Sequence, residues 1–82
     1  MIKILDQQEY YLLVSDGVHH TVVERRAGKF YPLCDRSRHG VALDEAGFAE
    51  IIREGGDHSL VEAQRLLAEV ATRWRDLNEH LW

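Results

Sequence analysis

The chain has 82 residues, a formal net charge of −4 and an apolar content of 45%. This length fits one small domain, and the apolar content is that of a globular protein rather than a disordered one. No run of ~20 apolar residues could span a bilayer, and the first residues do not look like a secretory signal. We therefore expect a single-domain cytoplasmic protein with no membrane partner. The net negative charge disfavours general binding to nucleic acid.

The charge is unevenly distributed along the chain. Residues 1–23 hold one basic and three acidic groups, residues 24–40 hold five basic and two acidic groups, and residues 41–82 hold four basic and nine acidic groups. A basic segment thus precedes an acidic C-terminal half, and each of them is a candidate surface for a partner of opposite charge.

The first 33 residues have the composition of a β-meander, with branched and aromatic runs separated by turn residues. The expected strands cover 2–5, 10–15, 18–25 and 29–33. Asp16-Gly17 is typical of a two-residue hairpin turn, which would place Val14 opposite His19. Alternation then puts Leu12 and Val14 on one face of the sheet and Leu13 on the other, so both faces are partly apolar.

Residues 34–43 read as a polar loop and a lead-in to a helix over 44–54. Asp44 is the expected N-cap of this helix, and Phe48 begins its apolar stripe. Gly47 should weaken the helix by roughly 1 kcal/mol relative to alanine. Gly55-Gly56 should end it.

The stretch 59–82 predicts one long helix. It opens with a capping box, in which the Ser59 hydroxyl bonds a free amide and Glu62 reaches back. Apolar residues then alternate at spacings of three and four, which is the pattern of a single helix face. This seam consists of Leu60, Ala63, Leu67, Val70, Trp74, Leu77 and Leu81.

Strands grouped before helices indicate an α+β fold of the ββββαα type, with an antiparallel meander of three to four strands and two helices packed on one face. A helix of 23 residues would be ~34 Å long, whereas a six-residue strand spans ~20 Å. The sheet should therefore cover the helix from about Leu60 to Val70 and leave its end uncovered. The residues expected at a protein interface are Trp74, Leu77, Leu81 and Trp82.

Known catalytic patterns are absent from the sequence, so we expect a protein that is not an enzyme and carries no cofactor or metal. The nearest approach to a reactive or metal-binding site is Cys34 with His39, and this metal or thiol site is one alternative function. The cysteine is the only one in the chain, which excludes an internal disulfide.

The runner-up function, ahead of the metal or thiol site, is a nucleic-acid-binding module, because basic groups beside aromatic residues can bind phosphates and stack on bases. Nucleic acid is not the favoured partner, since the chain is acidic and holds no recognised DNA- or RNA-binding motif. The contacting residues would be Arg25, Arg26, Lys29, Arg36 and Arg38.

The favoured hypothesis is a small, acidic, non-enzymatic protein-interaction module that forms a homodimer. Glu62, Glu69 and Asp76 recur every seven residues on the helix face away from the seam, and this acidic face would bind a basic partner. Bacterial or phage adaptors and inhibitors of nucleic-acid machines are proteins of this size and charge. The sequence does not name the partner.

Overall fold

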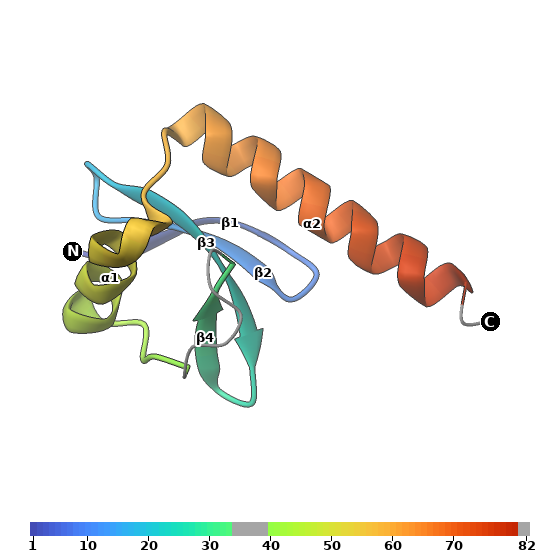
Figure 1. The fold of residues 1–82 in the computed structure, drawn as a ribbon, viewed down its shortest axis with the longest axis horizontal. Helices are drawn as coiled ribbons and strands as arrows, with labels where there is room; N and C mark the ends of the chain where they lie inside the picture. The colour runs from blue at the N-terminus through green and yellow to red at the C-terminus, as the bar shows by residue number, and fades with distance from the viewer. Residues whose placement is uncertain (34–39, 81–82) are drawn as a thin grey trace.

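The computed structural model describes residues 1–33 and 40–80, and the side chains of these residues as far as Asn78. A four-stranded antiparallel meander, with strand order β1-β2-β3-β4, is followed by two helices (Figure 1). The predicted α+β fold of the ββββαα type is confirmed. The elements are β1 (Lys3–Gln8), β2 (Tyr11–Ser15), β3 (His20–Arg26), β4 (Lys29–Pro32), α1 (Glu45–Ile51), the wide helical turn η1 (Ile52–Gly56) and α2 (Leu60–His80).

The β2–β3 hairpin is closed by a longer loop than the predicted two-residue turn. Ser15 faces His20 and Val14 faces Thr21, so the loop contains the four residues 16–19. The cause is Asp16, whose Oδ1 accepts hydrogen bonds from the backbone amides of residues 18 and 19 at 2.9 and 2.7 Å. The predicted register was wrong by two positions. An even shift keeps every side chain on its predicted face.

Each face of the sheet is covered by a different helix. Leu12, Val14 and Val23 are buried with Phe48 and Ile51 of α1. The alternate residues Leu13 and Val22 are buried on the opposite face by three residues of α2, which are Ala63, Leu67 and Val70. The expectation that both helices pack on one face was therefore wrong. Because β2 and β3 are apolar on both faces, each face needs its own helix, and Figure 1 shows the two helices on different sides of the strands.

Helix α1 begins as predicted at Asp44, whose Oδ1 accepts a hydrogen bond from the Gly47 amide at 2.7 Å. Gly47 has a structural role that helix propensity does not reveal. A Cβ at this position would overlap the carbonyl oxygen of Ala42 and lie 3.3 Å from Asp44 Oδ1. The segment that leads into α1 thus packs against a helix position that has room only for glycine.

Helix α2 begins after Ser59, whose Oγ accepts a hydrogen bond from the Glu62 amide at 3.1 Å, so the Ser59 half of the predicted capping box is confirmed. The Glu62 carboxylate does not bond the Ser59 amide; its Oε2 lies 3.8 Å from His58 Nδ1. The buried part of the seam is shorter than the predicted seam. Leu67 is fully buried, whereas Leu60 is 40% exposed and Leu77 is 66% exposed. Both ends of the apolar stripe therefore extend past the sheet, and Figure 1 shows the C-terminal part of α2 reaching beyond the strands.

The two edge strands of the sheet differ in whether their outer backbone groups are paired. The outer edge of β4 is paired, because Phe30 and Val41 exchange backbone hydrogen bonds of 3.0 and 2.9 Å. The outer edge of β1 has no paired strand among the described residues, but the strand carries a β-bulge between Ile4 and Asp6. Bulges on edge strands oppose the addition of a further strand. Within the described ranges, no helix has both the length and the apolar composition needed to cross a membrane.

The packing of Gly47 gives a prediction that opposes helix propensity. Replacing a helical glycine with alanine normally stabilises by roughly 1 kcal/mol. We predict that Gly47→Ala instead lowers the free energy of unfolding by about 1–3 kcal/mol, because the added methyl group overpacks the contact with Ala42. Urea denaturation measures this change, with Ala49→Gly at an exposed position of the same helix as a gauge of propensity alone. A Gly47→Ala protein as stable as the wild type would contradict the packing.

Candidate functional site

The distal half of α2 is fixed to the sheet by the turn between β1 and β2. The Trp74 ring packs edge-on against Tyr10, with ring centroids 5.3 Å apart and an interplanar angle of 73°. One residue further on, Arg75 Nε donates a hydrogen bond to Glu9 Oε1 at 2.7 Å. The sheet layer therefore holds the helix about one turn further than the predicted limit at Val70. Trp74, expected to need a partner, is partly covered by this chain's own Tyr10.

A groove separates this part of α2 from the strands. It has a volume of about 440 Å³. Its helix side is formed by four residues at positions i, i+3, i+4 and i+7, and this spacing makes the hole that receives a side chain from a second helix in knobs-into-holes packing. The residues that line it are Val70, Arg73, Trp74 and Leu77 on α2, and Tyr11, Glu24 and Arg26 on the strands.

The strand side of the groove carries one basic and one acidic group that pair with each other. Arg26 Nε pairs with Glu24 Oε1 at 3.2 Å. The Arg26 guanidinium also lies over the Tyr31 ring, 4.1 Å from its centroid. A guanidinium held by both a carboxylate and an aromatic face has little freedom to leave. The strand side of the groove therefore offers a partner no unpaired charge among the described residues.

The helix side carries the groove's one unpaired charge among the described residues. Arg73 is exposed, and no hydrogen bond or ion pair joins it to any described residue. Leu77 lies one turn further along the helix and is 66% exposed. An apolar hole next to a free guanidinium is suited to a partner that offers an apolar side chain and a carboxylate close together.

The predicted interface residues are partly located by the structure. Trp74 and Leu77 both line the groove, whereas Leu81 and Trp82 lie outside the described residues. The sequence prediction missed Arg73, because this residue belongs neither to the apolar seam nor to the acidic face of the helix. It also missed Tyr11 and Glu24, although they lie on the sheet face that α2 covers and β-strand alternation could have assigned them to it.

The predicted acidic face of α2 is exposed, but the same helix also exposes arginines. Among the described side chains of α2, three acidic and three basic groups are exposed. Arg65 and Arg73 therefore offset part of the negative charge of this helix, whereas Arg75 is paired with Glu9. The acidic groups are Glu62, Glu69 and Asp76, and the basic groups are Arg65, Arg73 and Arg75.

The predicted nucleic-acid contacts do not form one surface among the described residues. Arg25 and Arg26 are neighbours on β3, so their side chains point to opposite faces of the sheet. Arg26 is already paired with Glu24, and Lys29 is exposed opposite Arg26 in the hairpin. Arg36 and Arg38 lie outside the described residues.

The alternative site at Cys34 and His39 also lies outside the described residues. Within residues 1–33 and 40–80, no group of three or more His, Cys, Asp or Glu side chains is arranged to hold a metal ion. His19 and His58 instead each lie near one carboxylate, whereas the buried Nδ1 of His20 has no hydrogen-bond partner among the described residues. The contact at His19 connects two segments distant in sequence.

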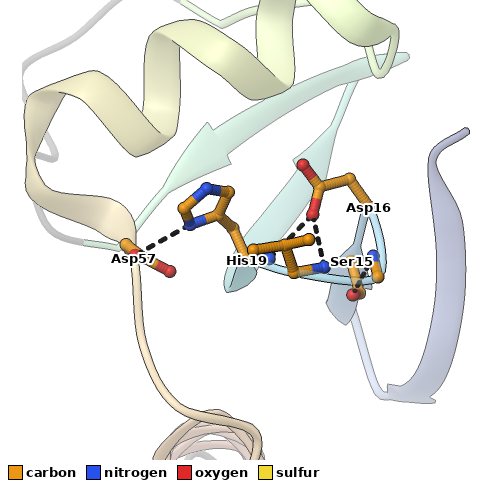
Figure 2. Close-up of polar contacts among 6 residues, drawn as sticks. Ser15, Asp16, His19 and Asp57 are labelled. Atoms are coloured by element: carbon orange, nitrogen blue, oxygen red, sulfur yellow. Dashed lines mark hydrogen bonds and ion pairs between the residues drawn. The ribbon is translucent and has the colours of Figure 1, made fainter.

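Figure 2 shows this contact between the β2–β3 loop and the linker that precedes α2. His19 Nδ1 lies 2.9 Å from Asp57 Oδ2. The loop itself is held by Asp16, and the amides of His19 and Val18 that donate to this carboxylate lower its pKa. The linker is also tied to the sheet by the backbone, because the His58 amide donates to the His20 carbonyl at 2.9 Å. These contacts fix the point from which α2 starts.

Comparisons of the chain with protein-family models, with curated proteins and with solved structures find no match. The groove and the charges around it are therefore the basis for a functional proposal.

The contact between His19 and Asp57 predicts a pH dependence of stability. The hydrogen bond from His19 lowers the pKa of Asp57 in the folded protein. A carboxylate with a lowered folded pKa stabilises the fold above its unfolded pKa, and this contribution is lost as the pH falls through the folded pKa. We predict that Asp57→Asn is less stable than the wild type near about pH 6 and that the difference shrinks below about pH 4, where an ordinary aspartate becomes protonated.

Urea denaturation over this pH range measures the effect. Glu69→Gln serves as the control, because Glu69 is exposed and makes no ion pair with a described residue. The difference in free energy of unfolding between Glu69→Gln and the wild type should stay nearly the same over this pH range. A deficit of Asp57→Asn that persists unchanged in acid would show that His19 does not stabilise the ionised carboxylate.

Proposed function

We propose that this protein is a small, non-enzymatic protein-interaction module that binds a helix of a partner protein in the groove between α2 and the sheet. The observation that supports the proposal most directly is the exposed Leu77 beside a hole of helical spacing. A surface leucine alone is unremarkable. A leucine that borders a groove together with a tryptophan and a valine has the composition of a contact surface.

The chemistry of the groove favours a helical occupant. Its length along α2 runs from Val70 to Leu77, which is two helical turns. Helix-in-groove recognition uses apolar anchors at the same three- and four-residue spacings. The free guanidinium of Arg73 at the rim adds a requirement for an acidic group within about one turn of the anchor.

The same groups do not suggest catalysis. The charged groups of the groove are the Glu24–Arg26 ion pair and Arg73, which are suited to recognising charge. An adaptor or an inhibitor acts by occupying a surface of its partner, and this needs only the contacts described above.

Selection of displayed helical peptides against the immobilised wild-type protein tests the proposal. We expect enriched peptides to carry apolar residues three or four positions apart and an acidic residue nearby. Their dissociation constants should be on the order of micromolar, as is common for small interfaces. Binding should weaken about tenfold for Leu77→Glu, since the apolar anchor would meet a charge.

Val61→Glu is the matched control. Val61 is 65% exposed and Leu77 is 66% exposed on the same helix, so both substitutions place a glutamate at equally exposed sites. Only Leu77 lines the groove. Peptides that bind Leu77→Glu as tightly as Val61→Glu, or a selection that enriches no peptide, would contradict the proposed groove.

A further inference from the structure

The distal half of α2 carries both the hole and a side chain that fits it. The hole is formed by Val70, Arg73, Trp74 and Leu77. Leu77, at the C-terminal end of this set, is 66% exposed and projects past the sheet. When a hole and a matching side chain lie on one helix, a two-fold axis between two antiparallel copies can place each leucine in the other copy's hole.

We infer that the occupant of the groove is α2 of a second copy of this chain, antiparallel to the first, with Leu77 of each copy inserted between Val70 and Trp74 of the other. This inference rests on the proposed function and names its partner. A Leu77 that meets the centre of the hole near residues 73 and 74 requires the two-fold axis to cross the groove at the level of residue 75 along α2.

The charges on α2 fit this axis. Arg73 and Asp76 are both exposed, and neither has a hydrogen bond or ion pair with a described residue. They lie on either side of an axis near residue 75. With a helical rise of ~1.5 Å per residue, Arg73 of one copy comes level with Asp76 of the other to within about one turn. The symmetry repeats the contact, so the dimer gains two ion pairs.

A second copy explains the balanced charge of α2 better than a basic partner does. A helix with an excess of one sign would repel its own copy. The described side chains of α2 instead carry equal numbers of acidic and basic groups. The strand wall of the groove is also neutralised by the pairing of Glu24 with Arg26. Two copies can therefore approach through this surface without net repulsion.

Sedimentation equilibrium with charge-exchange variants tests the inference. We expect the wild type to dimerise with a dissociation constant on the order of micromolar, given the small contact area. Arg73→Asp and Asp76→Arg should each weaken the dimer about tenfold, because each variant opposes like charges across the axis. The double variant Arg73→Asp/Asp76→Arg restores opposite charges and should recover the wild-type dissociation constant to within about threefold.

Two controls separate this contact from a general effect of charge or folding. Arg65→Asp makes the same charge change on the exposed surface of α2, outside the groove, and should leave the dimer unchanged. Circular dichroism melts establish that each variant is folded. Failure of the double variant to recover the dimer, or weakening by Arg65→Asp equal to that by Arg73→Asp, would overturn the antiparallel arrangement.

A wild type that stays monomeric would overturn the second copy as the partner. It would not by itself overturn the proposed function. In that case the displayed peptides would still bind in a manner that depends on Leu77, and the groove would serve a different protein. Loss of both the dimer and the peptide binding would overturn the two proposals together.

Discussion

The structure depends on the burial of the β2–β3 hairpin from both sides. Leu12, Val14 and Val23 need one cover, and Leu13 and Val22 need another. The described part of the chain supplies two α-helices for this purpose, and each face receives one. The short helix α1 fills the first face with Phe48 and Ile51, and the long helix α2 covers the second. Burial of these side chains supplies most of the driving force for folding.

This division leaves the end of α2 with little cover. Because α1 lies behind the sheet, it cannot pack against the distal half of α2. The sheet compensates only in part: its first turn brings Tyr10 to Trp74 and Glu9 to Arg75. Leu77 remains beyond this contact and borders the groove. The surface proposed as an interface is therefore left exposed because the two helices cover different faces of the sheet.

Features that depend on adjacent residues could be predicted from the sequence, whereas features that depend on contacts between distant segments mostly could not. Asp44 and Ser59 mark helix starts because capping depends on a few adjacent residues. The faces of β2 and β3 follow from alternation alone. The four-residue loop was missed because Asp16 bonds the amides that follow it, where Asp-Gly suggested a tighter turn. The role of Gly47 depends on Ala42 packing against it, which no local rule contains. The groove was found only through its apolar residues, since Arg73 and Glu24 carry no periodic signal.

In the proposed dimer, Leu77 of one copy packs against Trp74 of the other. Isotope-filtered nuclear Overhauser spectroscopy on a mixture of labelled and unlabelled protein tests this contact directly, because it reports only contacts between copies. The proposed dimer should give signals between the Leu77 methyl groups and the Trp74 indole protons of the other copy. A filtered spectrum without these signals, or with signals only from residues of β1, would contradict it.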